Sequence, residues 1–296
     1  MKVLKIMPQG YCKGVILALK KCIEVINNPN TVKPIYLLGM IIHNRFVCEE
    51  LEKLGVIILE GNDKETLLKE IENGTVIISA HGVSRKIKQL ALTKNITLID
   101  TTCPDVNKVH NNALSYINEG YEVLYIGKKN HPEAIGVLEE SSKIHLLDSV
   151  DNIKIIDKNK KYYVTNQTTL SHDYISKFHE ELINNNINVI IENNICYATT
   201  KREKALYDIK TDLIVVVGDY HSSNTNKLVQ VAKEKAHTKA VIAIERAHDL
   251  LKYDLTEYQE AYVTSGASTP NVLVEQVIRF LETNDLEILN EELFFF

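Results

Sequence analysis

The 296-residue sequence has no long apolar run and no recognisable export signal. Its longest strongly apolar stretches, such as Leu213 to Val217, have the length of one strand. A membrane-spanning helix needs roughly 20 apolar residues. The segment Met1 to Met7 is interrupted by Pro8 and Gln9, and it lacks both the apolar length and the cleavage site of a secretory signal. These absences predict a cytoplasmic protein without a transmembrane helix.

Basic residues do not outnumber acidic ones, and the formal net charge is -5. A nucleic-acid binder usually shows a basic excess, so we expect no nucleic-acid partner, and any anionic ligand must be held by local donors. Proline is scarce, with 6 residues, and no Gly/Ser-rich or Pro-rich linker divides the chain. The composition is that of a folded protein whose parts pack tightly together.

The chain does contain β-branched runs that each end in a small or polar loop and then open into an amphipathic segment. Such strand-loop-helix units indicate parallel α/β sheets, in which ligands gather at the carboxyl ends of the strands. The nine predicted strands are Val3 to Met7, Ile35 to Leu38, Thr75 to Ser79, Thr97 to Asp100, Glu122 to Ile126, Tyr162 to Thr165, Asn188 to Glu192, Leu213 to Val217 and Ala261 to Thr264.

Cysteines stand in the first, fourth and seventh of the loops that follow these strands. They are Cys12, Cys103 and Cys196, and the intervals between them are 91 and 93 residues. This spacing indicates a weak internal repeat of three similar α/β units, each with one cysteine loop and two polar loops. The predicted units are residues 1–103, which include the N-terminal strand and the Cys12 loop, then 104–195 and 196–283, followed by a tail at 284–296.

The chain has five cysteines, an odd number for a protein without an export signal, and this favours metal ligation or catalysis over disulfides. Cys22 and Cys48 fall in helical stretches and are interpreted as small buried hydrophobic residues. The other three precede helix starts, where the helix dipole favours a thiolate. Three equivalent thiolates suit an iron-sulfur cluster or zinc, and they leave one coordination position open for catalysis.

The remaining loops carry histidines and hydroxyl side chains. His43, His81 and His131 each stand between a strand and a helix start, so they are candidates for a shared pocket. A helix is expected to open at Ser222, Ser223 and Asn224. Another is expected to open at Ser268. These residues can be ordinary caps, or they can complete an anion site that suits phosphate.

One carboxylate in these loops has an evident reaction role. Glu133 follows His131 and Pro132, and it could relay protons to a bound substrate. Burial would raise the pKa of Glu133 and the helix N-terminus would lower it, so the sequence leaves its net direction open. Thr168 could orient a substrate hydroxyl or cap a helix.

Taken in order, these loops resemble those of one protein family. The segments YCKGV, IIHNR, SAHGVS, TCPDVNKVH, HPE, QTTLS, CYATT, SSNTN and SGAST resemble the LytB/IspH family, from about residue 1 to 282. The family reduces (E)-4-hydroxy-3-methylbut-2-enyl diphosphate in the final step of the non-mevalonate isoprenoid pathway. A few neighbouring positions depart from the family pattern, namely GKKNHPE, DYH and SGASTPN.

The resemblance implies a cloverleaf of three pseudo-equivalent small α/β domains around a central 4Fe-4S cluster. It implies that Cys12, Cys103 and Cys196 ligate the cluster and that a fourth iron is open to the substrate hydroxyl. Two electrons and two protons then remove this oxygen as water, giving isopentenyl and dimethylallyl diphosphate. The electrons would come from an external donor such as ferredoxin or flavodoxin.

The resemblance also implies roles for the polar loops. The residues implied to hold the diphosphate are His43, His81, Ser222, Ser223, Asn224 and Ser268. His131 would lie near the substrate, Glu133 would deliver protons and Thr168 would contact the hydroxyl end. Two alternatives use the same cysteines: a three-cysteine zinc hydrolase, and a non-catalytic iron-sulfur sensor.

Overall fold

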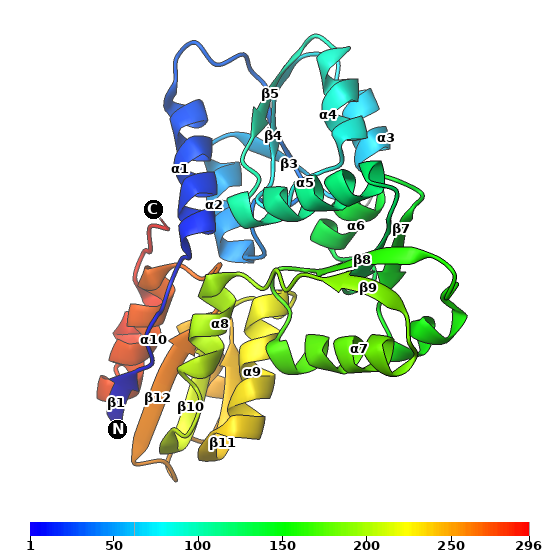
Figure 1. The fold of residues 1–296 in the computed structure, drawn as a ribbon. Coiled ribbons are helices and arrows are strands. Elements are labelled where there is room, and N and C mark those ends of the chain that lie inside the picture. The colour runs from blue at the N-terminus through cyan, green and yellow to red at the C-terminus, as the bar shows by residue number, and fades with distance from the viewer. Residues whose placement is uncertain (62, 296) are drawn as a thin grey trace. The chain divides into compact units, whose positions relative to one another are not determined.

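The structure is a computed structural model that describes residues 1–61 and 63–295. Within these ranges it contains twelve strands in three four-stranded sheets (Figure 1). In spatial order the sheets are β1 (Lys2–Lys5), β12 (Glu260–Ser265), β10 (Lys210–Val217) and β11 (His237–Ile244); β3 (Val56–Leu59), β2 (Ile35–Leu38), β4 (Gly74–Ile78) and β5 (Ile96–Asp100); and β7 (Ile144–Leu147), β6 (Glu122–Ile126), β8 (Lys161–Asn166) and β9 (Asn188–Ile191).

Helices connect these strands. They are α1 (Lys13–Asn27), α2 (Arg45–Lys53), α3 (Lys64–Glu70), α4 (Arg85–Leu92), α5 (Pro104–Asn118), α6 (Pro132–Leu138), α7 (His172–Asn184), α8 (Tyr197–Lys204), α9 (Ser223–Lys235) and α10 (Asn271–Thr283), with 3-10 segments η1 (Val150–Ile155), η2 (Ala247–Lys252) and η3 (Leu286–Asn290). No helix in the described ranges is long and apolar enough to cross a membrane. The predicted α/β class is confirmed.

The three sheets share one topology. All their strand pairs are parallel, and in the sheets of β2 to β5 and β6 to β9 the spatial order is second, first, third, fourth. The third sheet has the same order only if β1 is counted as its fourth strand, because Val3 of β1 aligns with Ala261 of β12. The N-terminal strand thus pairs with a strand from the last third of the chain.

Each of the nine predicted strands overlaps a strand of the structure, and β3, β7 and β11 were missed. These three are the second strands of their sheets and lie at an edge. They lead into α3, of seven residues, and into the six-residue segments η1 and η2. Such short segments carry too little periodicity to show an amphipathic pattern, so the strand-loop-helix signature is absent there.

The continuous apolar runs reflect burial on both faces of a sheet, as is usual for parallel strands. In β10, Val215 packs into a core with Val277 of α10, whereas Val216 packs on the other face with Leu228 of α9. Each of these side chains is at most 1% exposed. Full burial of a valine or leucine stabilises the fold by about 1.5–3 kcal/mol, and the sheet therefore holds its outgoing loops firmly.

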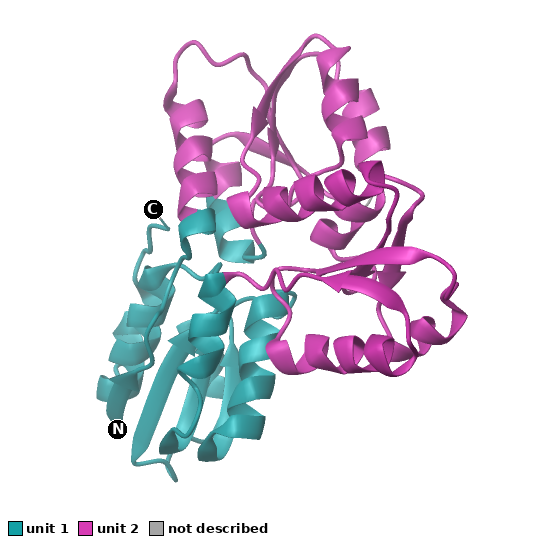
Figure 2. Cartoon of the chain, viewed as in Figure 1, with its two compact units in different colours: residues 1–15, 43–50, 197–296 teal, residues 16–42, 51–196 magenta. Residues whose placement is uncertain are grey.

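The chain forms two compact units, coloured separately in Figure 2. Unit 1 comprises residues 1–15, 43–50 and 197–296, and unit 2 comprises residues 16–42 and 51–196. The predicted tail begins at Asn284, directly after α10, and it packs in unit 1: Ile288 is buried, and the Tyr11 hydroxyl donates to the Phe295 carbonyl at 3.1 Å. Phe296 lies outside the described residues. The division at residues 103, 195 and 283 stays a prediction.

Candidate functional site

The three loop cysteines occupy equivalent places in the three sheets. Each follows the fourth strand of its sheet, β1, β5 or β9, and stands just before a helix. Each backbone N–H donates to a carbonyl two residues beyond the end of the neighbouring third strand. The three bonds run from Cys12 to Ala267, from Cys103 to Ala80 and from Cys196 to Thr168, each at 3.0 Å. The predicted repeat therefore appears as the same backbone hydrogen bond in each of the three sheets.

The cysteines divide into two groups by burial. Cys22 and Cys48 are 0% and 4% exposed, which confirms their interpretation as packing residues. Cys12, Cys103 and Cys196 are partly exposed, and none of the five forms a disulfide. Cys12 belongs to unit 1, and Cys103 and Cys196 belong to unit 2. Within the described ranges no group of three His, Cys, Asp or Glu side chains stands ready to hold a metal ion, so the ligand set stays a prediction.

Gly10 fixes the Cys12 loop. Its N–H donates to the Ser265 hydroxyl at 2.8 Å, and its carbonyl accepts from the Arg202 guanidinium at 2.6 Å. Gly10 has a φ of +68°, and an added Cβ would overlap the Asn271 side chain, so only glycine fits here. Arg202 is 2% exposed and comes from α8, the helix that begins directly after Cys196.

In unit 2, Glu133 and Thr168 form a buried pair. The Thr168 N–H donates to Glu133 Oε1 at 2.8 Å, and the Thr168 hydroxyl donates to Oε2 at 3.1 Å. Both residues are buried, and the Thr168 carbonyl is the acceptor for the Cys196 N–H. One threonine therefore connects the predicted proton-delivery residue to a cysteine loop.

Burial decides the protonation of Glu133. Its side chain is 1% exposed, and this desolvation raises the pKa of Glu133 to about 7, although the two hydrogen bonds from Thr168 act to lower it. The question left open by the sequence is thereby answered in favour of burial. A carboxyl group with this pKa exchanges protons readily at neutral pH.

The two candidate histidines of unit 2, His81 and His131, are neighbours. The rings of His81 and His131 are perpendicular, with centroids 5.8 Å apart. His131 caps α6 by accepting the Glu133 N–H on Nδ1 at 3.2 Å, and His81 Nδ1 lies 3.4 Å from the Ser79 hydroxyl. Since Ala80 accepts the Cys103 N–H, the predicted residues of unit 2 gather along one continuous set of loops.

In unit 1 the other predicted residues gather around the start of α9. Ser222 caps this helix by accepting the Thr225 N–H at 3.3 Å. The Ser223 hydroxyl and Asn224 Nδ2 are buried without a hydrogen-bond partner in the described structure, and the two residues are 6% and 5% exposed. Buried donors without partners are costly, so this helix start is suited to an anion.

His43 and Ser268 lie together in the same unit. The Ser268 hydroxyl donates to the His43 carbonyl at 2.9 Å. Burial lowers the pKa of His43, although the nearby Asp219 carboxylate acts to raise it. A neutral imidazole at neutral pH can donate one hydrogen bond to a ligand without carrying a charge.

Several positioning residues were missed by sequence reasoning. Arg202 was not singled out, although a basic side chain within the helix after a cysteine loop is a usable signal. Asp219, in the DYH segment, accepts the Arg45 N–H at 3.0 Å and the His221 N–H at 2.7 Å. Asp100, at the end of β5, accepts both donors of Thr102 beside Cys103. Each of these side chains binds a backbone group, and such a bond requires no particular residue type at the partner position, so the sequence does not reveal it.

Fold and site together define a threefold-repeated parallel α/β protein with one thiol loop in each repeat. The profile of the family described as LytB protein matches residues 3–282. The 4-hydroxy-3-methylbut-2-enyl diphosphate reductase of Symbiobacterium thermophilum is 42% identical, over 97% of this chain and 99% of its own. The reductase of the same name from Bacillus subtilis is 41% identical, over 97% and 92%.

Solved structures agree with these relatives. The structure of the E-1-hydroxy-2-methyl-but-2-enyl-4-diphosphate reductase from Plasmodium falciparum is similar with a TM-score of 0.86 and 34% identity, covering 95% of this chain and 88% of that one. A structure of (E)-4-hydroxy-3-methyl-but-2-enyl diphosphate reductase, the terminal enzyme of the non-mevalonate pathway, is similar with a TM-score of 0.69 and 29% identity, over 95% and 99%. This chain belongs to the LytB family.

Proposed function

We propose that this chain is an oxidoreductase that removes the hydroxyl group of (E)-4-hydroxy-3-methylbut-2-enyl diphosphate. The reaction takes up two electrons and two protons, releases water, and gives isopentenyl and dimethylallyl diphosphate. The relatives that carry this activity in their names cover nearly the whole chain. The observation that carries the proposal is the matched set of three cysteine loops, each bound through its amide at 3.0 Å.

The cofactor of this proposal is an iron-sulfur cluster of the 4Fe-4S type held by Cys12, Cys103 and Cys196. The donor set suits it, because soft thiolates at three equivalent loops cannot all pair as disulfides and leave one iron without a protein ligand. When bound, such a cluster would supply electrons one at a time and a Lewis-acidic position for the hydroxyl oxygen. No observation favours the zinc hydrolase or the sensor.

The start of α9 is the proposed diphosphate site. Support comes from the buried donors of Ser223 and Asn224, which have no partner in the described structure, and from the 13-residue helix behind them. Backbone N–H groups at a helix start and its dipole both favour a phosphate. His43, His81, Ser222 and Ser268 complete the proposed set. Diphosphate binding here would supply remote binding energy that fixes the reacting carbon.

Glu133 is the proposed proton donor. Its carboxyl group is buried, has a pKa raised to about 7, and is oriented by both Thr168 hydrogen bonds. At neutral pH a large fraction of this group is protonated, as general acid catalysis requires. Thr168 is proposed to contact the hydroxyl end of the substrate and His131 to lie beside it. The electron donor is proposed to be a ferredoxin or flavodoxin, and the compartment the cytoplasm.

The test is purification without oxygen, followed by measurement of iron, sulfide, zinc and visible absorbance. We expect iron and sulfide in equal amounts and turnover of the allylic diphosphate with a reduced dye. A colourless protein with zinc and no iron would overturn the proposal in favour of the hydrolase. An iron-sulfur protein without turnover would overturn it in favour of the sensor.

A variant tests the proton assignment separately. Glu133→Gln should lower turnover by about 10²–10⁴-fold, while iron and sulfide content stay unchanged. The matched control is Glu72→Gln, which neutralises an exposed carboxylate of the same unit. Full turnover in Glu133→Gln would contradict the role of Glu133 and leave the reductase assignment intact.

A further inference from the structure

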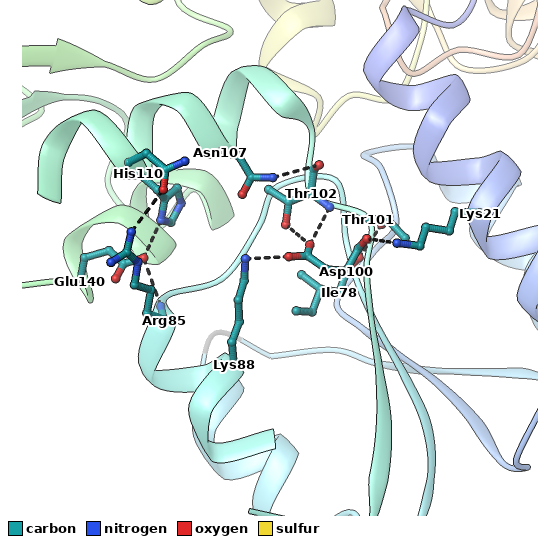
Figure 3. Close-up of polar contacts among 11 residues, drawn as sticks. Lys21, Ile78, Arg85, Lys88, Asp100, Thr101, Thr102, Asn107, His110 and Glu140 are labelled. Carbon is teal, nitrogen blue, oxygen red and sulfur yellow. Dashed lines mark hydrogen bonds and ion pairs between the residues drawn. The ribbon is translucent and has the colours of Figure 1, made fainter. Parts of the chain in front are cut away.

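Thr102, the residue directly before Cys103, is held in place by the side chain of Asp100 (Figure 3). Asp100 is the last residue of β5, and its Oδ1 accepts the Thr102 N–H at 2.9 Å and the Thr102 hydroxyl at 2.5 Å. Its Oδ2 accepts from Lys88 Nζ at 2.7 Å. The carboxylate therefore ties the residue next to Cys103 to the end of the strand and to α4.

Other bonds fix the same segment from its backbone side. Lys21 Nζ donates to the Asp100 carbonyl at 2.8 Å, and the Thr101 hydroxyl donates to the carbonyl of Ile78 in β4. The Cys103 N–H itself is bound to Ala80. Between these anchors only Thr102 depends on a side-chain acceptor, and that acceptor is Asp100.

The second cysteine loop of unit 2 has the same turn. Asn193 stands three residues before Cys196, as Asp100 stands three before Cys103. Its Oδ1 accepts the Ile195 N–H at 3.0 Å, which is the same side-chain bond to the residue next to the cysteine. An amide oxygen is thus sufficient for this turn. The same turn therefore holds the residue before the cysteine in both cysteine loops of unit 2.

The charge of Asp100 is balanced by Lys88. Burial acts to raise the pKa of Asp100, but the hydrogen bonds from Lys88 and Thr102 outweigh it and hold this pKa below its usual range. The group is therefore ionised and paired at neutral pH. Lys88 neutralises this negative charge close to the Cys103 loop, where a second anion would otherwise oppose a thiolate.

We propose that Asp100 is a positioning residue for the Cys103 thiolate, acting through its two hydrogen bonds to Thr102. The inference rests on the proposed function, because it takes Cys103 to be a ligand of the cluster. Removing a residue that orients a metal ligand without itself binding the metal typically lowers metal affinity by about 10–100-fold. Asp100 contacts neither substrate nor reacting atoms in this scheme.

The test compares three variants of the anaerobically purified protein. Asp100→Ala removes both bonds to Thr102, whereas Asp100→Asn keeps an oxygen that can accept both, as Asn193 does in its own loop. The matched control is Asp63→Ala, because Asp63 likewise accepts the N–H and hydroxyl of one threonine, Thr66, at 3.0 and 2.7 Å. Asp63 caps α3 in the same unit and does not belong to a cysteine loop.

The measurement is the rate at which each protein loses iron to a chelator, together with the electron paramagnetic resonance spectrum after reduction. We expect Asp100→Ala to lose iron about tenfold faster or more, with an altered spectrum. Asp100→Asn and Asp63→Ala should stay within about twofold of the parent. Equal iron loss in Asp100→Ala and the parent, or equally fast loss in Asp63→Ala, would overturn the inference.

Two further outcomes separate this inference from the proposed function. A parent protein that takes up no iron and sulfide overturns the proposed function and the inference with it. A parent that holds a full cluster while Asp100→Asn fails as completely as Asp100→Ala overturns only the inference, because the amide should restore the turn. Thermal unfolding of each variant shows whether its fold is destabilised in general. A general destabilisation from losing such a carboxylate should also appear in Asp63→Ala.

Discussion

The buried carboxyl group of Glu133 should make the stability of this protein depend on pH. In the unfolded chain it ionises near its ordinary pKa of 4.5, and in the folded protein its pKa is raised to about 7. Below about pH 4.5 it is protonated in both states and has no effect on stability. Between these values the unfolded chain gives up the proton and the folded chain keeps it, so stability falls as pH rises.

The size of the effect follows from the difference between the two pKa values. Each unit of pKa corresponds to 1.36 kcal/mol, so the loss is about 3 kcal/mol and is complete above about pH 7. Glu133→Gln removes the titration. Its amide can still accept the Thr168 N–H and donate to the Thr168 hydroxyl, so the packing should be retained.

The assay is urea unfolding of parent and variant, without oxygen, from about pH 4.5 to 8. The free energy of unfolding of Glu133→Gln, relative to the parent, should rise by about 3 kcal/mol over this interval. The control Glu72→Gln changes an exposed carboxylate, and its difference from the parent should stay flat. A flat difference for Glu133→Gln, or one that grows as the pH falls, would refute the argument that burial dominates this site.

Four other substitutions test the ligand, anion and packing assignments. Cys103→Ser should lose most iron and sulfide, whereas Cys22→Ala, at a position 0% exposed, should keep both and lower the unfolding free energy by about 1–2 kcal/mol in urea titrations. Asn224→Ala should raise KM for the diphosphate substrate by about tenfold at unchanged iron content. Gly218→Ala should cost about 1–3 kcal/mol on urea unfolding, because φ is +158° and the new Cβ would press on the Thr225 hydroxyl.

Sequence patterns located the nine strands that lead into the candidate site loops, and they missed β3, β7 and β11, which do not. The run Leu213 to Val217 was readable because both faces of β10 are buried, which leaves a continuous apolar string. The pairing of β1 with β12 was not readable, because strand partners 258 residues apart leave no local pattern. Spacing nevertheless grouped the cysteines correctly into equivalent loops, since it depends on the repeat and not on the partner strand.

The chemistry of the candidate site was predictable only in part. The residue type and loop position of Glu133 indicated a proton relay, but the direction of its pKa depends on how completely neighbouring elements exclude water, and a sequence does not contain that quantity. The role of Asp100 was hidden for a different reason. In the sequence, Asp100 is a polar residue at the end of a strand, and only the structure shows that its side chain accepts the N–H of Thr102, the residue before Cys103.

The repeat explains how three loops with almost no common sequence can present equivalent thiols. The bond that holds each cysteine joins backbone to backbone, from the cysteine N–H to the carbonyl two residues past the third strand. Such a bond is specified by strand order and is indifferent to the acceptor's side chain, which is Ala80, Thr168 or Ala267. Side chains at these positions were therefore able to diverge. At Thr168 the side chain has a second role, because its hydroxyl donates to Glu133, while the N–H of the same residue also donates to Glu133 and its carbonyl accepts from Cys196.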